Sequence, residues 1–298
     1  EQIASLTCDL VLNAITGSIG LAPTLAALAS GNKVALANKE SLVAGGDLVM
    51  AYGSEKIIPV DSEHSALFQA MSAGRVSDVS KLILTASGGP FRDRQDLSQV
   101  KLADALAHPT WSMGPVVTIN SATLVNKGLE IIEAHYLFSI AYSKIEAVIH
   151  PQSIVHSLVE FKDGSTLAQA SPPDMKGPIA YALAYPNRVG GAMAPINWNS
   201  KQSWEFEPID EKRFPAVQLA RRAGALGSSV AAIYNAANEV AVAAFMKEEI
   251  AFTAIVDTIE KVVDKLSASA PSRIRDISDV SAIEQDARIY AREVLEKG

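Results

Sequence analysis

Residues 9–60 read DLVLNAITGSIGLAPTLAALASGNKVALANKESLVAGGDLVMAYGSEKIIPV. Short apolar runs alternate here with helix-like segments, in the order 9–15, 17–28, 33–37, 38–53 and 56–60. Pro23 suits the first turn of a helix, and Gly31 suits a helix C-terminus. Strands that alternate with helices form a parallel sheet with right-handed crossovers. This stretch therefore predicts a parallel α/β sheet.

The pattern changes twice farther along the chain. Between 61 and 185 we expect a mixed α+β region, with a helix at 121–138 and strands at 81–89, 115–120, 146–151, 153–161 and 166–171. Asp163-Gly164 suits the turn of a hairpin between the last two strands. Residues 186–210 show little periodicity and are predicted as a linker. From 211 to 298 the apolar spacing is helical and predicts a small helical bundle.

Composition excludes several classes of protein. The 298 residues are 48% hydrophobic and 20% charged, which is typical of a globular chain. The net charge of −7 disfavours nucleic-acid binding, and no apolar run reaches the length of a membrane span. Cys8 is the single cysteine, and no secretory signal is recognised, so we expect a reducing, cytoplasmic compartment. Without HExxH or CxxC motifs, a metal site would use oxygen ligands.

Two carboxylates follow the third predicted strand. Asp61 and Glu63 are two residues apart, so an extended backbone would point both to the same side. Such a pair at a strand end can bind Mg²⁺ or Mn²⁺ and leave room for substrate. The alternative is that both acids stabilise the N-terminus of the helix that follows. The spacing leaves both interpretations open.

A second polar group lies on the predicted helix 121–138. Asn126 and Glu130 share a helix face, and Lys127 is adjacent to them. Ser121 would lie at the helix N-terminus, where backbone N–H groups favour an anion. The helix thus predicts a phosphate site beside a metal-binding carboxylate, and a capped helix with a surface Lys–Glu pair is the alternative. Glu133 is expected to be a solvated partner on this helix.

Three further segments can contribute to a site. Ser87-Gly88-Gly89 ends a strand with exposed amides, which suits an anion or simply a turn. The stretch HPTWSMG (108–114) can act as a lid over a ligand or cover a small satellite core. Lys39 follows a strand at the ligand-binding edge of the parallel sheet, where it suits an anionic or hydroxylated substrate or is an ordinary surface charge.

Taken together, these blocks resemble the 1-deoxy-D-xylulose 5-phosphate reductoisomerase family. The blocks that carry the resemblance occur in order with similar spacing from about residue 9 to the end: ANKESLV (37–43), PVDSEHSALFQ (59–69), LTASGGPFRD (84–93), HPTWSMG (108–114), NSATLVNKGLEIIEAHYLF (120–138), IHPQSIVHSLVEF (149–161), DGSTLAQASPPDMKGPIAYALAYPNRV (163–189) and NAANEVAVAAF (235–245).

The resemblance implies a three-part architecture and an activity. Residues 1–60 would belong to a Rossmann-like NADPH-binding domain, 61–185 to a catalytic and dimerisation domain, 186–210 to a linker and 211–298 to a helical domain. The family rearranges and reduces 1-deoxy-D-xylulose 5-phosphate to 2-C-methyl-D-erythritol 4-phosphate in non-mevalonate isoprenoid biosynthesis. It uses NADPH and one Mn²⁺ or Mg²⁺ ion and acts as a homodimer.

The resemblance also assigns roles to individual residues. Metal ligands would be Asp61, Glu63 and Glu130, and the catalytic group would add Lys39 and His108 to them. Substrate would be bound by Ser62, Ser87, His108, Trp111, Ser121, Asn126 and Lys127. The NADPH site would include Gly17, Asn38, Glu40, Met113 and Met175, with Trp111 and Met113 on the lid.

One departure from the family pattern concerns the start of the sequence. Chains of this family open with a strand and a Gly-rich loop that holds the NADPH phosphates, and this sequence begins after them. We therefore expect upstream residues to be missing and NADPH affinity to fall severely. Two alternatives therefore stay open, namely a sugar-phosphate-binding or dimerisation module without catalysis and a metal-dependent sugar-phosphate phosphatase. A phosphatase would place its metal within about 6 Å of the phosphate.

Overall fold

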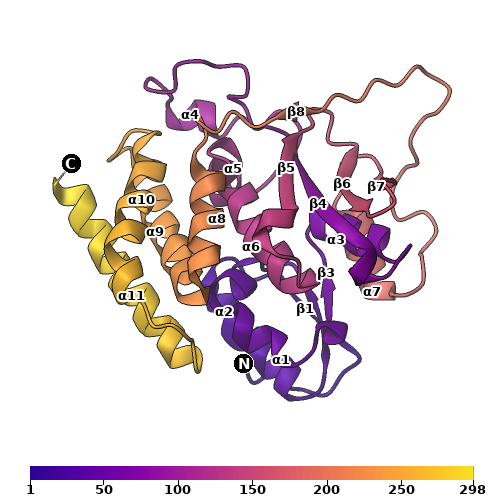
Figure 1. Ribbon diagram of the computed structural model, residues 1–298, viewed down its shortest axis with the longest axis horizontal. Coiled ribbons are helices and arrows are strands. Elements are labelled where there is room, and N and C mark those ends of the chain that lie inside the picture. Colours follow the sequence, from indigo (N-terminus) through magenta and orange to yellow (C-terminus); the bar gives the residue numbers. More distant parts are fainter. Residues whose placement is uncertain (298) are drawn as a thin grey trace.

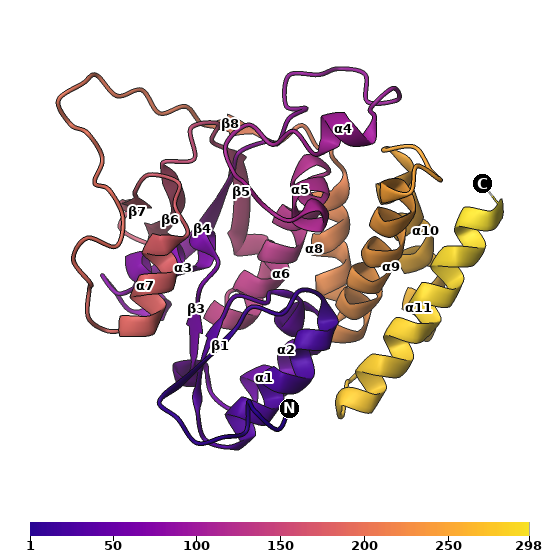
Figure 2. The ribbon, with the colours of Figure 1, turned by 180° about the vertical axis from the view of Figure 1, so that it is seen from behind.

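The computed structural model describes residues 1–297 and arranges them in three regions (Figure 1). The N-terminal region is a small parallel sheet with two helices, and a larger mixed sheet follows along the chain. The C-terminal helices α8 to α11 stack at the opposite side of the molecule from β6 and β7, and the view from behind shows the same arrangement (Figure 2). Helix α6 lies between the mixed sheet and this helical layer.

The first sheet confirms the α/β prediction. Its strands are parallel, in the order β1-β2-β3, with bounds Leu10–Asn13, Lys33–Leu36 and Ile57–Pro59. Helices α1 (Leu21–Ala29) and α2 (Glu40–Met50) connect these strands. Val34, Ala35 and Leu36 are completely buried, because the middle strand is flanked by strands on both sides and packed on both faces.

The second sheet has the order β7-β6-β4-β5-β8 and is mixed. Its strands are β4 (Val79–Ala86), β5 (Ile145–Ile149), β6 (Val155–Phe161), β7 (Thr166–Ala170) and the short β8 (Glu207–Pro208). β4 and β5 are parallel, whereas the other pairs are antiparallel. The predicted β6–β7 hairpin is confirmed, and Gly164 adopts a φ of +85° in its turn.

Two predictions in the middle of the chain were wrong. The expected strand 115–120 is helix α5 (Pro115–Ala122), and the expected helix 121–138 is divided, since α6 spans Val125–Phe138. The β-branched run PVVTI looked like a strand, but Pro115 at the first helical position favours a helix start. Leu124 has a φ of +58°, which ends α5 and re-aims the chain into α6.

The remaining helices surround these sheets. Helices α3 (Ser62–Met71) and α7 (Lys176–Ala184) pack beside β6 and β7, away from the C-terminal bundle, and the short α4 (Leu102–Ala105) lies next to α5 (Figure 1). Of these, α4 and α7 were not predicted. The C-terminal bundle is confirmed, with α8 (Ala216–Leu226), α9 (Ser228–Met246), α10 (Ala254–Leu266) and α11 (Ile277–Lys297). By length and composition α9 could cross a membrane, but 78% of its apolar window is buried in the fold, as expected for a core helix.

Close packing joins α6 to the helical layer at Gly128. A Cβ atom at this position would lie 2.7 Å from the Ala220 Cβ and 2.9 Å from the Tyr234 hydroxyl. Tyr234 is itself completely buried, and its hydroxyl donates to the Ala216 carbonyl. A side chain larger than hydrogen would therefore push α6 away from α8. Because α6 also contains Asn126, Lys127 and Glu130, this contact helps to position the candidate site.

We expect Gly128→Ala to lower the free energy of unfolding by about 1–3 kcal/mol, because the added methyl group overpacks the α6–α8 contact. Its gain in helix propensity, at most about 1 kcal/mol, does not compensate fully. Urea denaturation would measure the change. Gly190→Ala is the control, since a Cβ there meets no atom within 4 Å, and an equal loss in both variants would contradict the packing argument.

Candidate active site

A cavity of about 290 Å³ lies where α3, α5 and α6 meet the C-terminal edges of β3 and β4. Thirteen of the residues singled out from the sequence line this cavity, namely Lys39, Asp61, Ser62, Glu63, Ser87, His108, Trp111, Met113, Ser121, Asn126, Lys127, Glu130 and Met175. They come from segments up to 136 positions apart (175 − 39). The fold thus gathers most of the predicted site around one space.

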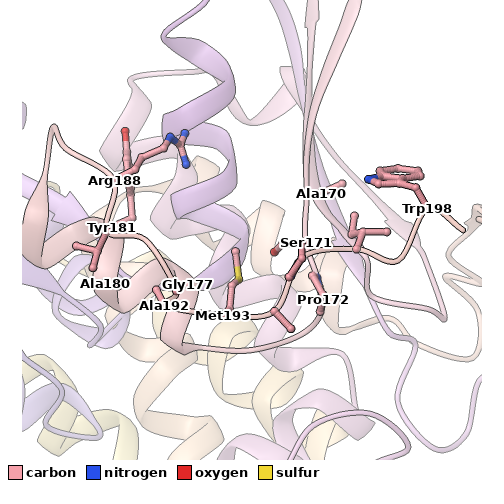
Figure 3. A pocket seen from close by; sticks show the side chains of 15 residues that line it. Ala170, Ser171, Pro172, Gly177, Ala180, Tyr181, Arg188, Ala192, Met193 and Trp198 are labelled. Atoms are coloured by element: carbon pink, nitrogen blue, oxygen red, sulfur yellow. The ribbon is translucent and has the colours of Figure 1, made fainter.

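A second cavity, of about 410 Å³, lies between α7 and the loop that follows it (Figure 3). Its lining is largely apolar and includes Met193 and Trp198. Arg188 is its one ionisable cation among the lining residues, and its guanidinium stacks 4.9 Å from the ring centre of Tyr181. This cavity lacks a cluster of acid–base groups among residues 1–297, so the first cavity is the better candidate for chemistry.

Three carboxylates converge in the first cavity. Donor oxygens of Asp61, Glu63 and Glu130 lie within 4.8 Å of one another. The reason given for the first two was wrong, because β3 ends at Pro59 and the pair does not extend from a strand. Asp61 is instead the N-cap residue of α3, and Glu63 lies in its first turn, where the helix dipole favours acids. The convergence is therefore produced by two helices.

Two lysines, the buried Lys127 and the partly buried Lys39, contact these carboxylates. The Lys39 ammonium lies 2.5 Å from Asp61 Oδ2 and 3.0 Å from both Glu130 Oε1 and Asn126 Oδ1. The Lys127 ammonium lies 2.7 Å from Glu63 Oε1 and also contacts Glu130. Three acids and two lysines leave a formal charge of −1 (2 − 3). The predicted surface pair does not occur, because only 3% of the Lys127 side chain is exposed.

The electrostatics separate Asp61 from Glu63. Burial and the neighbouring Glu130 raise the pKa of Glu63 to about 7. Burial also disfavours ionised Asp61, but Lys39 and His64 overcome it and hold the pKa of Asp61 well below its usual range. Burial alone would lower the pKa of Lys39, yet Asp61 and Glu130 raise it well above the usual value. A cation added to this cluster would stabilise the ionised form of Glu63.

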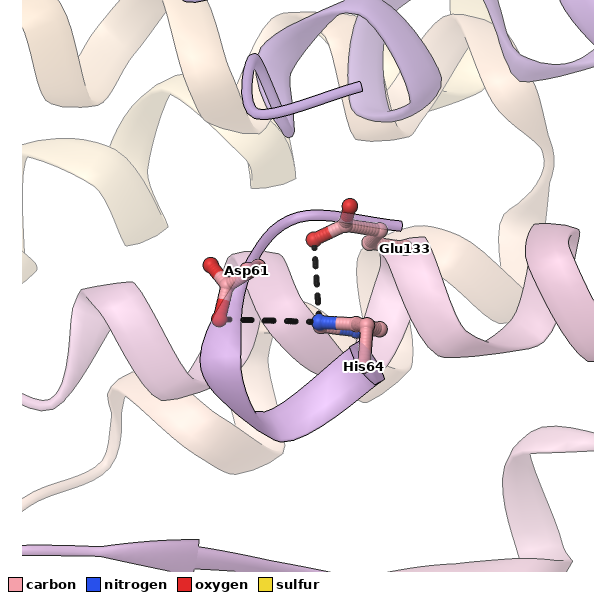
Figure 4. A group of neighbouring side chains, drawn as sticks. All are labelled: Asp61, His64 and Glu133. Carbon is pink, nitrogen blue, oxygen red and sulfur yellow. Dashed lines mark ion pairs between the residues drawn. The ribbon is translucent and has the colours of Figure 1, made fainter. Parts of the chain in front are cut away.

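Behind the carboxylates lies a buried pair that the sequence analysis missed (Figure 4). His64 Nδ1 lies 3.3 Å from Glu133 Oε2 and 3.8 Å from Asp61 Oδ1, while Nε2 donates to the Glu130 carbonyl at 2.8 Å. The expectation that Glu133 is solvated was wrong, since its side chain is completely buried against α3. Burial raises the pKa of Glu133 to about 8. Burial of His64 would lower the pKa of its ring, but the neighbouring Glu133 carboxylate outweighs this effect, and the pKa of His64 rises to about 9.

The spacing of these residues contained a signal for this pair. His64 is three residues after Asp61 and Glu133 is three residues after Glu130, so each shares a helix face with a cavity carboxylate. What the sequence did not show is that the two faces pack against each other. That packing leaves His64 Nδ1 and both Glu133 oxygens with no hydrogen-bond partner within residues 1–297, apart from the ion-pair contacts of His64 Nδ1 with Glu133 and Asp61.

At the other end of the cavity, Ser87 and His108 form a hydrogen-bonded pair. His108 Nδ1 accepts from the Thr110 and Trp111 amides at 3.1 and 2.9 Å, so Nε2 carries the proton of the neutral ring and donates to Ser87 Oγ at 3.0 Å. Burial lowers the pKa of His108, which favours this neutral form. The Ser87 hydroxyl also accepts from the Gly89 amide at 3.2 Å.

The prediction that one helix provides the phosphate site was wrong, because its residues lie on two helices. Ser121 lies in the last turn of α5, whereas Asn126 and Lys127 open α6 and bond to the carboxylates. The Gly88-Gly89 turn brings Ser87 close to the end of α5, since a Cβ at Gly89 would lie 3.1 Å from the Ser121 carbonyl oxygen. Ser87, His108 and Ser121 therefore gather by tertiary packing of a loop and a helix end.

Gly17, Asn38 and Glu40, which were expected near NADPH, lie together outside the cavity lining. The Asn38 amide donates to the Ile15 and Gly17 carbonyls at 2.5 and 2.9 Å and to Glu40 Oε2 at 2.9 Å. These bonds join the start of α2 to the loop after β1. The sequence analysis did not single out several further lining residues, which are Ala37, Thr85, Ala86, Ser112, Val117, Leu124, Ser153 and His156.

Comparison with known proteins gives a consistent result. Residues 1–46 match the sequence model described as 1-deoxy-D-xylulose 5-phosphate reductoisomerase, residues 57–138 match that enzyme's C-terminal domain, and residues 170–290 match a DXP reductoisomerase C-terminal domain. The chain is 56% identical over 296 residues to 1-deoxy-D-xylulose 5-phosphate reductoisomerase of Kitasatospora griseola, covering 98% of this chain and 77% of the relative. The Mycobacterium marinum enzyme of the same name is 59% identical over 276 residues, or 91% of this chain and 69% of that enzyme.

Solved structures agree with the sequence matches. A DOX-P reductoisomerase in complex with NADPH, fosmidomycin and magnesium is 39% identical, with a TM-score of 0.92 over 99% of this chain and 78% of that one. The 1-deoxy-D-xylulose 5-phosphate reductoisomerase from Zymomonas mobilis in complex with NADPH is 42% identical, also with a TM-score of 0.92, over 99% of this chain and 77% of that one. The resemblance seen in the sequence motifs is confirmed, and the chain belongs to the 1-deoxy-D-xylulose 5-phosphate reductoisomerase family.

Proposed function

We propose that this protein rearranges 1-deoxy-D-xylulose 5-phosphate and reduces it with NADPH to 2-C-methyl-D-erythritol 4-phosphate, a step of non-mevalonate isoprenoid biosynthesis. The observation that carries the proposal is the convergence of Asp61, Glu63 and Glu130 in a cavity that also holds Ser87 and His108. The carboxylates lie at one end of the cavity, and the uncharged polar side chains of Ser87 and His108 lie at the other. This arrangement suits a substrate that has metal-chelating oxygens at one end and a phosphate group at the other.

The three carboxylates suit one hard divalent cation, Mn²⁺ or Mg²⁺. All the converging donors are oxygens, which these ions prefer to nitrogen or sulfur. The raised pKa of Glu63 indicates like-charge repulsion and burial that a cation would relieve. When bound, such an ion supplies Lewis-acid stabilisation of negative charge on the substrate oxygens.

The residues of the chain would divide the remaining work. We propose that Lys39 and Ser62 contact the hydroxylated carbons, since both line the cavity beside Asp61. Once a cation neutralises Glu63 and Glu130, the Lys127 ammonium becomes available to the phosphate. The phosphate group would then be bound by Ser87, His108, Ser121, Asn126 and Lys127. Binding energy from this remote group helps to orient the reacting carbons.

The lid and the NADPH side complete the proposed site. Trp111 and Met113 line the cavity from the loop between α4 and α5, where they can exclude water from the reacting carbons. NADPH, when bound, supplies the hydride that reduces the rearranged aldehyde. Met175 would face the nicotinamide, and the NADPH site would also include Gly17, Asn38 and Glu40.

The regions would have separate roles in this proposal. Residues 1–60 would serve NADPH binding, 61–185 catalysis and dimerisation, 186–210 a connection and 211–298 support by the helical layer. A cytoplasmic location agrees with the single free cysteine, Cys8. A homodimer agrees with the exposed apolar side chains of Leu167, Leu183, Val189 and Trp198, which lie on β7, α7 and the loop after it.

The dimer predicts a specific effect of charge on this surface. Leu183 is 55% exposed on α7, so Leu183→Asp should leave the fold intact but weaken self-association at least about tenfold if the surface is an interface. Sedimentation velocity would measure the monomer–dimer equilibrium. Leu226→Asp, at an exposed leucine that ends α8, is the matched control. Dimers of unchanged strength in the Leu183 variant would place the interface elsewhere.

Cation binding should depend on pH through Glu63. Its pKa of about 7 without metal means that protons compete with the cation below that pH. Mn²⁺ affinity should therefore fall by up to about tenfold for each pH unit below 7 and change little from Glu63 above about pH 8. Isothermal titration across this range would measure the slope. Glu63→Gln should bind Mn²⁺ more weakly and lose most of the slope, and an unchanged slope would exclude Glu63 as the titrating ligand.

Lys127→Ala separates substrate binding from cation binding. Loss of a charge-assisted contact to phosphate should weaken sugar-phosphate binding by roughly 10- to 150-fold. Mn²⁺ affinity should not fall, because the variant removes an ammonium that competes for Glu63 and Glu130. Titration of both ligands would decide, with the exposed Lys176→Ala as control. Unchanged sugar-phosphate binding together with lost Mn²⁺ binding would make Lys127 a structural partner of the carboxylates.

A further inference from the structure

A charged cluster connects the C-terminal helices to the loop between β1 and α1. The Arg288 guanidinium on α11 donates through Nη2 to Glu239 Oε2 at 2.8 Å, to Glu284 Oε2 at 3.2 Å and to Ser18 Oγ at 3.2 Å. The Ser18 hydroxyl in turn donates to Glu284 Oε2 at 2.8 Å, and its amide points to Glu239 Oε1 at 3.4 Å. We call these four residues the clasp.

The clasp is partly shielded from solvent. The Glu284 side chain is 7% exposed, while those of Arg288 and Glu239 are 28% and 29% exposed. Burial raises the pKa of Glu284, and the guanidinium opposes this shift. An isolated ion pair at a surface contributes little, but one guanidinium shared by two carboxylates and a hydroxyl forms a network with defined geometry. Asn235 also donates to Glu239 Oε1 at 3.1 Å, which orients that carboxylate.

The same loop is also held by Asn38, two residues before the start of α2. Asn38 donates to the Ile15 and Gly17 carbonyls, and a Cβ at Gly20 would lie 2.5 Å from Asn38 Oδ1. Gly17 has a φ of +83°, which costs little only for glycine. The loop is therefore hydrogen-bonded both to Asn38 and to the C-terminal helices. Ser18 and Glu284, which form one of these bonds, are 266 positions apart in the sequence.

The position of this loop suggests why it is held. It follows β1 at the carboxyl edge of the parallel sheet, and ligands of open α/β sheets bind in the crevice outside that edge. A loop that presents backbone groups to a ligand binds it more tightly when the loop is ordered beforehand, because less conformational entropy is lost on binding. The clasp supplies such order from outside the parallel-sheet region.

We propose that Arg288 is a positioning residue for NADPH, acting through the clasp to hold the backbone of residues 15–20 in its binding conformation. The cofactor part of this inference rests on the proposed function. The helical layer then contributes to cofactor affinity without contacting the carboxylate cluster. Arg288 itself would touch the loop and the two carboxylates, so its effect on the reaction is indirect.

Two measurements on Arg288→Ala test the proposal. Hydrogen exchange of the Ser18, Ile19 and Gly20 amides should accelerate by about 3- to 10-fold, because the loop opens locally more often. The dissociation constant of NADPH, followed by its fluorescence, should rise by about 3- to 10-fold, whereas Mn²⁺ affinity and kcat at saturating NADPH should stay within about twofold. Arg292→Ala, an exposed arginine on the same helix, should change neither quantity. Arg288→Lys should recover part of both effects, since it keeps the charge.

The outcomes separate the clasp from the proposed function. Unchanged loop exchange in Arg288→Ala would overturn the clasp whatever happens to NADPH. Faster loop exchange with unchanged NADPH affinity, in a protein whose wild-type form binds NADPH, would overturn the cofactor role. If the wild-type protein binds no NADPH, the proposed function and the cofactor role fall together, while the exchange data still decide whether Arg288 orders the loop. Global unfolding would instead accelerate exchange throughout α9 and α11, which would overturn a local role.

Discussion

The burial of three carboxylates in one cavity is the constraint on which the rest of the structure depends. Asp61, Glu63 and Glu130 repel one another, and burial increases the cost of ionising Asp61 and Glu63. Lys39 and Lys127 offset this cost from opposite sides, and each contacts the Glu130 carboxylate. A pair of lysines that offsets most of the charge of the acidic cluster without filling the cavity leaves the acids available to a cation. The same arrangement explains why Lys127, adjacent to Asn126 on α6, is buried and not a surface charge.

The fold meets this constraint by bringing two helix starts together. Asp61 and Glu63 open α3, whereas Asn126 and Lys127 open α6 after the left-handed turn at Leu124. Without that turn α5 would continue in its own direction and Glu130 would point elsewhere. His64 then joins α3 to α6 through the Glu130 carbonyl, and Glu133 supplies the charge opposite its ring. The carboxylates are thus supported by a second, fully buried layer of polar contacts, which restricts their side-chain freedom.

The helical layer contacts two segments that shape the candidate site, namely α6 and the loop after β1. At Gly128 it allows α6 to approach α8 closely, and this contact sets the depth of the helix that contains Glu130. At Ser18 it reaches the loop after β1 through Glu239, Glu284 and Arg288. Both contacts join segments that are far apart in the sequence. The helical layer therefore contacts both the helix that contains Glu130 and the loop after β1.

The sequence by itself determined the regular elements with strong periodicity and the residue types of the site. The alternation in 9–60 predicted the parallel sheet, the helical spacing after 211 predicted the bundle, and the acids at 61, 63 and 130 were recognised as a possible cation site. Local pattern could not decide PVVTI at 115–119, because β-branched residues suit a strand until Pro115 and the surrounding packing favour a helix. Only the tertiary structure decided that Glu133 is buried, that Lys127 neutralises Glu63 and that Ser18 is held by Arg288. Each of these depends on which surfaces meet across long stretches of chain, and the spacing of residues along one helix does not contain that information.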